Sequence, residues 1–182
     1  MAKTPVVIYF HGLGGTANSE KAAKLRESFP EANFIALNLT GPIGPVSTHE
    51  VWRRLSDAIN NIDLTDVSKI VFVGISLGGY YARIFGERYD VPYVLINPVT
   101  DPEQVKSLVT PEFLVDLKSI NSSETTGSLV HLLLGDDDDV IPPEAAQSFF
   151  KYKSFCLSKK DDHNFENHWS LVTDLVKKVI EK

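Results

Sequence analysis

The stretch that decides the fold is Val71-Phe72-Val73-Gly74-Ile75-Ser76-Leu77-Gly78-Gly79, in the middle of the chain. An apolar run typical of a buried strand precedes the serine, and a segment with helical spacing, 77–89, follows it. A serine on such a strand-to-helix turn stands at the N-terminus of the helix, where its hydroxyl can attack a carbonyl carbon. The turn is sharp, so the residues that flank the serine in space must be small, as Gly74 and Gly78 are. The pattern predicts that Ser76 is a nucleophile on a strained turn.

Outward from this turn, short apolar runs rich in Val, Ile and Phe alternate with longer amphipathic stretches. Such runs are typical of parallel strands that are buried on both faces. We expect six strands, at 6–10, 34–37, 70–73, 93–96, 129–134 and 154–157. Helices are expected at 20–29, 47–60, 77–89 and 166–180, and two more are expected to start at Asp101-Pro102 and at Pro142-Pro143. Ser47 and Glu50 fit a capping box at the start of the helix 47–60. Strands joined by helices in this way predict a parallel sheet with helices on both faces.

The length of 182 residues and the share of hydrophobic residues, 43%, predict one globular domain over residues 1–182. The net charge of -6 and the scattered Lys and Arg argue against a nucleic-acid partner. Cys156 is the only cysteine, which fits a reducing compartment, and we expect it in the core. No segment has a secretory pattern or approaches the roughly 20 apolar residues that span a bilayer, so we expect a cytoplasmic protein without a membrane partner.

Because ligands bind beyond the carboxyl ends of parallel strands, the residues that follow each predicted strand are the candidates for chemistry. His11-Gly12-Leu13-Gly14-Gly15 follows the first strand, and its glycines let the backbone approach a substrate closely. We expect the N–H groups of Leu13 and Leu77 to bind an oxyanion, with Gly12 against the substrate and His11 structural. Neither a dinucleotide-binding nor a Walker pattern is present, so no cofactor is expected.

A candidate acid follows the fifth predicted strand, in the run 136–139 of four aspartates. Asp138 is favoured because it stands two residues before the apolar pair Val140-Ile141, which leads into the next helix. The other three aspartates remain alternatives, and Asp101, beyond the fourth strand, is an outside candidate. The run lacks the alternating pattern of a calcium loop, so we expect no metal.

A candidate general base follows the sixth predicted strand. His163 lies in a polar loop before the last helix, where the base belongs in the chain order serine, acid, histidine. His168 is the alternative, about a turn into the helix. His49 and His131 are not accompanied by other candidate catalytic residues and are expected to be structural.

The stretches 76–82 and 96–98 resemble the elbow and the following segment of the small bacterial esterases of the YqiA type, in the α/β-hydrolase superfamily. The resemblance continues through the turn at Asp138 and through 163–165, and so covers nearly the whole chain in order. A looser similarity extends to the short serine hydrolases related to the retinoblastoma-binding hydrolase. The resemblance implies an α/β-hydrolase fold and hydrolysis of carboxylic esters by Ser76, Asp138 and His163.

Two positions depart from the family pattern. The family usually has a glycine just ahead of its catalytic histidine, where this chain has Lys160-Asp161-Asp162. The family also usually has a smaller residue where Ile75 stands, so we expect Ile75 to contact the substrate and narrow the acyl side of the site.

About thirty residues separate Asn97 from Leu129, which leaves room only for a small lid or none. The expected function is therefore hydrolysis of esters or thioesters with short to medium acyl chains, through an acyl-enzyme. The alternative is a catalytically silent binding module that keeps the hydrolase fold as a scaffold, because a fold does not by itself prove an activity. The sequence leaves the oligomeric state open.

Overall fold

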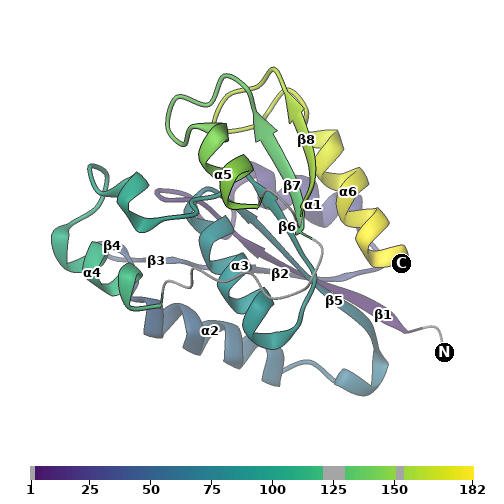
Figure 1. Ribbon diagram of the computed structural model, residues 1–182. Coiled ribbons are helices and arrows are strands. Elements are labelled where there is room, and N and C mark those ends of the chain that lie inside the picture. The colour runs from purple at the N-terminus through teal and green to yellow at the C-terminus, as the bar shows by residue number, and fades with distance from the viewer. Residues whose placement is uncertain (1–2, 121–129, 151–153) are drawn as a thin grey trace.

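The computed structural model describes residues 3–120, 130–150 and 154–182, and for residues 154–158 it describes the backbone alone. The strands of the central sheet and the helices alternate along the described chain, from β1 (Thr4–Phe10) to α6 (Trp169–Glu181) (Figure 1). Two expectations lie outside this part of the chain: the start of the fifth strand at Leu129 and the core position of the Cys156 side chain.

The central sheet has six strands in the described residues: β1, β2 (Asn33–Leu37), β5 (Val67–Ile75), β6 (Tyr93–Ile96), β7 (Val130–Gly135) and β8 (Ser154–Lys159). Their order across the sheet is β2-β1-β5-β6-β7-β8, and every neighbouring pair is parallel. The predicted parallel sheet is therefore confirmed. The chain runs outward from β1 to β2, returns to β5 and continues outward to β8. Sheets of this kind bind ligands where the order reverses, here beyond the carboxyl ends of β1 and β5.

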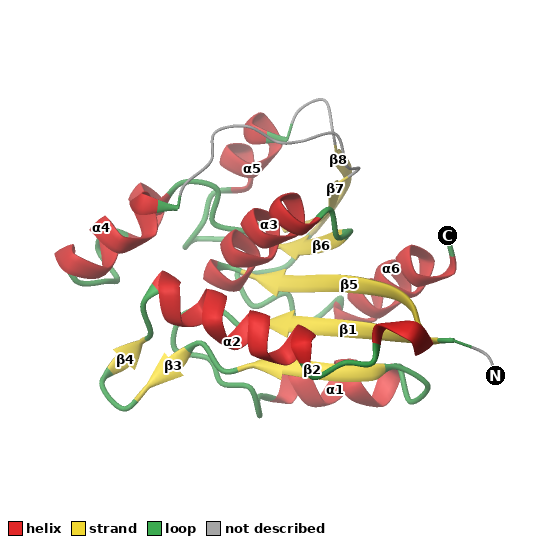
Figure 2. Ribbon diagram, turned by 90° about the horizontal axis from the view of Figure 1, so that it is seen from below, coloured by secondary structure: helices red, strands yellow, loops and turns green. Residues whose placement is uncertain are grey.

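Helices cover both faces of the sheet, as predicted. One face carries α1 (Glu20–Ser28) and α6, and the other carries α2 (Thr48–Asn60), α3 (Leu77–Tyr89) and α5 (Pro143–Phe149) (Figure 2). Successive side chains of β1 alternate between the two resulting cores, with Val6 and Ile8 in one and Val7 and Tyr9 in the other. Both faces are covered, which is why the strands read as unbroken apolar runs in the sequence.

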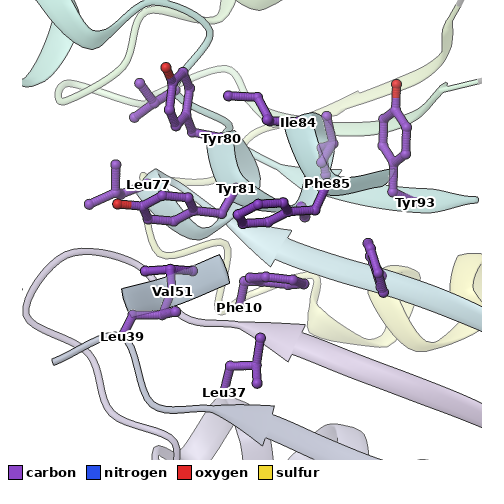
Figure 3. Close-up of a cluster of buried hydrophobic side chains, with 14 of the residues drawn as sticks. Phe10, Leu37, Leu39, Val51, Leu77, Tyr80, Tyr81, Ile84, Phe85 and Tyr93 are labelled. Atoms are coloured by element: carbon purple, nitrogen blue, oxygen red, sulfur yellow. The ribbon is translucent and has the colours of Figure 1, made fainter. Parts of the chain in front are cut away.

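An aromatic cluster holds α3 against the carboxyl end of β1 (Figure 3). The Phe10 ring lies 5.4 Å from the Phe72 ring and 6.4 Å from the Phe85 ring, measured between centroids. Tyr81 stacks on Phe85 at 6.1 Å. Because α3 begins directly after Ser76, this packing also fixes the serine turn beside the loop that follows β1.

The connection between β6 and β7 differs from the predicted helix that starts at Asp101. It forms a short 3-10 helix, η2 (Pro102–Val105), and then a separate helix, α4 (Pro111–Ser119), that begins after the capping residue Thr110. The carboxylate of Asp116 in α4 accepts hydrogen bonds from the N–H and hydroxyl of Thr48, at 2.6 and 2.9 Å. The described part of this connection therefore packs against the first turn of α2.

Three short elements escaped the sequence analysis: β3 (Thr40–Gly41) and β4 (Gly44–Pro45), which pair antiparallel, and the 3-10 helix η1 (Leu64–Asp66). Elements of two or three residues are too short for a hydrophobic period to show. None of the helices in the described part combines the length and the apolar character needed to cross a membrane.

The predicted capping box at α2 is only half formed. The Ser47 hydroxyl accepts from the Glu50 N–H at 3.3 Å, as expected. The Glu50 carboxylate instead accepts hydrogen bonds from Arg53 and Arg54, at 2.7 to 2.8 Å. Charged guanidinium donors attract a carboxylate more strongly than the neutral N–H at the start of the helix does, which explains the difference.

Candidate active site

Ser76 connects the end of β5 to the first residue of α3 and has backbone angles φ 54° and ψ -123°. Positive φ is unfavourable for a residue with a side chain, so the turn is strained. Its backbone is fixed by hydrogen bonds, because Ser76 N–H donates to Ile96 O at 3.0 Å and Ser76 O accepts from Gly79 N–H at 2.9 Å. Both flanking glycines are required: a Cβ at Gly74 would lie 2.8 Å from the Ala82 Cβ, and one at Gly78 would clash with the backbone carbonyls of Phe10 and His11, at the end of β1.

The side chains of Ser76, His163 and Asp138 lie in one hydrogen-bonded row. His163 Nε2 is 2.9 Å from Ser76 Oγ, and His163 Nδ1 is 2.8 Å from Asp138 Oδ2. A carboxylate can only accept, so Nδ1 carries the proton and donates to Asp138, while Nε2 accepts from the Ser76 hydroxyl. This is the arrangement in which an imidazole can take the proton of an attacking hydroxyl. The structure thus brings together the three residues predicted as nucleophile, base and acid.

Among the four consecutive aspartates, Asp138 is the buried one, and its three neighbours in the run 136–139 are exposed. Its Oδ1 also accepts from the N–H groups of Val140 and Ile141, at 2.9 and 2.8 Å. These bonds hold the carboxylate toward His163. The turn geometry therefore selects the aspartate that the sequence analysis favoured.

The other histidine candidate, His168, has a different partner. Its Nδ1 donates to the Asp161 carboxylate at 3.0 Å. His11 is structural in its contacts: Nδ1 donates to Gly12 O at 2.8 Å, and Nε2 accepts from Leu39 N–H at 2.9 Å. Burial lowers the pKa of His11, which favours the neutral ring that this pair of bonds needs.

The remaining candidates lie away from the row. His49 packs on the Trp52 ring at 5.9 Å, and His131 is buried in β7. Asp101 is exposed and accepts from the Glu103 N–H at 2.9 Å, where it caps η2.

Asp161 orders the loop that carries His163, a role that the sequence analysis missed. Its buried carboxylate accepts four hydrogen bonds of 3.0 Å, from Asp162 N–H, the Asn167 amide, His168 N–H and His168 Nδ1. Burial alone would raise the pKa of Asp161, but these hydrogen bonds outweigh it and hold that pKa below its usual value. The bonds fix residues 161–168 outside the helix, which explains why α6 begins at Trp169 and not at 166.

Asn97 is a second residue that the sequence analysis left without a role. It is 1% exposed, and its φ of 41° lies in the left-handed region that asparagine tolerates. Its amide donates to the carbonyls of Asp162 and His163, at 3.0 and 3.1 Å, and its Oδ1 accepts from Gly135 N–H at 2.7 Å. The side chain therefore ties the His163 loop to the strand end that leads to Asp138. The only sequence signal was an asparagine before a proline at a strand end.

A cavity of about 290 Å³ opens beside Ser76 and His163. Gly12, Leu13 and Ile75, three of the predicted contact residues, line it. A Cβ at Gly12 would lie 3.2 Å from the Ser76 Cβ, so the glycine permits this close approach of the loop after β1. No residue of the described β6–β7 connection, up to 120, lines the cavity.

The two predicted oxyanion donors flank the serine. Leu77 is the first residue of α3, so its N–H is one of the groups that have no acceptor within the helix. Leu13 belongs to the loop after β1 and lines the cavity. Their role as donors stays a prediction.

A six-stranded parallel sheet wound in this order, with a serine on a strained turn after β5, is the α/β-hydrolase fold. The family model described as "Uncharacterised protein family (UPF0227)" matches residues 6–177, and the chain belongs to this family. The predicted relationship to the small YqiA-type proteins is thereby confirmed.

A UPF0227 protein of Shewanella woodyi is 24% identical over 168 residues, which cover 88% of this chain and 91% of that protein. Among solved structures, Est1E from Butyrivibrio proteoclasticus superposes with a TM-score of 0.78 at 19% identity, over 99% of this chain and 88% of the other. The monoacylglycerol lipase of Paleococcus ferrophilus gives a TM-score of 0.71 at 18% identity, over 98% and 96%. The structural neighbours include esterases and lipases, and at these identities the likeness shows the fold.

Proposed function

We propose that the protein is a serine hydrolase that cleaves carboxylic esters or thioesters of short to medium acyl chains. The observation that carries this proposal is the row from Ser76 through His163 to Asp138, with bonds of 2.9 and 2.8 Å, at the edge of a cavity. A scaffold without activity would not need this alignment of nucleophile, base and acid. Esterases and lipases among the structural neighbours support the same conclusion.

In the proposed reaction, Ser76 Oγ attacks the acyl carbonyl while its proton moves to His163 Nε2. The Asp138 carboxylate stabilises the imidazolium, and the N–H groups of Leu13 and Leu77 stabilise the oxyanion of the tetrahedral intermediate. His163 then protonates the leaving alkoxide or thiolate, and the acyl-enzyme remains. A water molecule, deprotonated by His163, attacks this ester, and the carboxylic acid is released as Ser76 regains its proton.

The size of the cavity sets the size of the substrate. Its volume of about 290 Å³ lies at the lower end of the range of about 300–1,000 Å³ that is common for ligand sites. Ile75 forms part of the wall next to the serine. These dimensions favour a short acyl chain over a long one.

The test is covalent labelling of the purified protein with a fluorophosphonate probe, which phosphonylates an activated serine. We expect stoichiometric labelling at Ser76, found by mass spectrometry of the digested protein, together with hydrolysis of 4-nitrophenyl acetate. A folded protein that neither reacts with the probe nor hydrolyses the ester would be the silent binding module, and the proposal would be wrong.

Changing the acid should separate the four aspartates. We expect Asp138→Asn to lower kcat by about 10³-fold, because an amide can donate to His163 and then favours the tautomer with the proton on Nε2, which cannot accept from Ser76. The same change at the exposed residues Asp136, Asp137 and Asp139 should alter kcat less than about threefold. The measurement is kcat for one short ester with all four variants. Equal losses at Asp138 and Asp139 would contradict the assignment of the acid.

A further inference from the structure

Two lysines of α1, Lys21 and Lys24, border the cavity that contains Ser76 and His163. Each is paired with a glutamate that also borders it: Lys21 Nζ is 3.1 Å from Glu166 Oε1, and Lys24 Nζ is 2.7 Å from Glu20 Oε1. The two side chains of each pair differ in solvent exposure. The Lys21 side chain is 18% exposed and that of Glu166 is 66% exposed, while the values for Lys24 and Glu20 are 44% and 80%. In both pairs the ammonium belongs to the less exposed side chain.

Lys21 makes further contacts at the cavity wall. Its Nζ lies 3.5 Å from the side-chain oxygen of Asn164, the residue next to His163, and 5.9 Å from the centre of the Trp169 ring. The aromatic face and the oxygen atoms fix the ammonium at the cavity wall, so little side-chain entropy is left to lose when an anion binds. The chain as a whole carries a net charge of -6. Two lysines at this cavity therefore do not simply reflect a basic protein surface.

The pair with Glu166 is weak enough for an anion inside the cavity to take the place of this carboxylate at Lys21 Nζ. A carboxylate that is two-thirds exposed is screened by water, and pairs of this kind contribute little. An anion at Lys21 Nζ would form a charge-assisted hydrogen bond, which is stronger than a hydrogen bond between neutral groups.

We propose, on the basis of the function proposed above, that Lys21, assisted by Lys24, binds an anionic group of the substrate, so that the protein prefers esters that carry a carboxylate. The carboxylate lies on a short arm, since the cavity measures only about 290 Å³. It accepts a hydrogen bond from Lys21 Nζ while the ester carbonyl lies at Ser76.

The test compares the hydrolysis rate of each anionic ester with that of a neutral ester of the same shape. The rate is measured by titrating the released acid. Monoethyl succinate against ethyl 4-oxopentanoate places the charge on the acyl half, and acetoxyacetate against acetoxyacetone places it on the alcohol half. We expect kcat/KM to favour the anionic member of at least one pair, and that pair identifies which half of the substrate occupies the cavity.

Lys21→Met keeps an unbranched apolar stem beside Trp169 and removes only the charge. It should lower kcat/KM for the preferred anionic ester by about tenfold or more and leave the neutral ester within about twofold. Lys21→Arg should retain the preference, and Glu166→Gln should increase it. Lys177→Met is the matched control: it changes the net charge equally at an exposed site of α6 outside the cavity lining, and should leave the preference unchanged.

Two results are distinguishable. Failure to hydrolyse any of the four esters, charged or neutral, would count against the proposed hydrolase function itself. Hydrolysis of the neutral esters with no preference for the anionic ones, or with a preference that Lys21→Met leaves intact, would overturn the lysine site alone.

Discussion

Ser76→Ala is expected to abolish ester hydrolysis, with a loss in kcat on the order of 10⁴-fold or more, and to leave the fold intact. The substitution removes one oxygen atom, the only atom of the row that forms a bond to the substrate in the proposed reaction. Alanine keeps the backbone conformation and fits the space of the serine, so the aromatic packing of α3 on β1 is unaffected.

The measurement is the initial rate on a short ester, with circular dichroism and thermal unfolding to compare the folds. The fluorophosphonate probe should no longer label the variant. A folded Ser76→Ala protein with activity within tenfold of the parent would contradict the assignment of the nucleophile.

His163→Ala should produce a loss of similar size and also change the dependence of the rate on pH. An imidazole accepts a proton only in its neutral form, so hydrolysis by the parent should rise with pH. Without the imidazole at 2.9 Å from Ser76 Oγ, this rise should disappear. The measurement is kcat against pH for a small activated ester, after subtraction of the uncatalysed rate.

His168→Ala is the matched control, because it removes an imidazole from the same loop. Asp161 keeps three of its four donors in this variant, so the loop should hold and the rate should fall no more than several-fold. The rise with pH should persist. A profile that flattens in His168→Ala and persists in His163→Ala would reverse the assignment of the base.

The sheet and its flanking helices could be predicted from the sequence, because strands that are buried on both faces leave unbroken apolar runs and the intervening helices leave amphipathic ones. The glycines at 74 and 78 gave the serine turn a recognisable pattern, although Gly78 is needed for a distant contact, with the carbonyls of Phe10 and His11. Family membership followed from these motifs in order. The separate helix α4 was not predicted, because its start depends on the cap at Thr110 and on packing against α2.

Asn97 and Asp161 could not be found in the same way. Asn97 bonds to residues 38, 65 and 66 positions further along the chain, and a single sequence gives no record of such distances. Asp161 stood in a polar loop with nothing in the sequence to give it a role, yet its buried carboxylate accepts four hydrogen bonds. The choice of Asp138 among the aspartates at 136–139 agrees with the geometry because a positional rule matched the burial that the turn imposes, and the role of Asp138 as the acid stays a prediction.

The backbone angles of Ser76 have a consequence for how this chain can change over evolutionary time. A residue with a side chain is strained at φ 54°, and glycine at the same position would not be. The fold is therefore less stable with serine at position 76 than it would be with glycine. Selection for stability alone would favour losing the serine, so under the proposed function the hydroxyl persists only while its chemistry is needed. A descendant freed from catalysis should therefore accumulate glycine at this turn first, while the aromatic core around it stays unchanged.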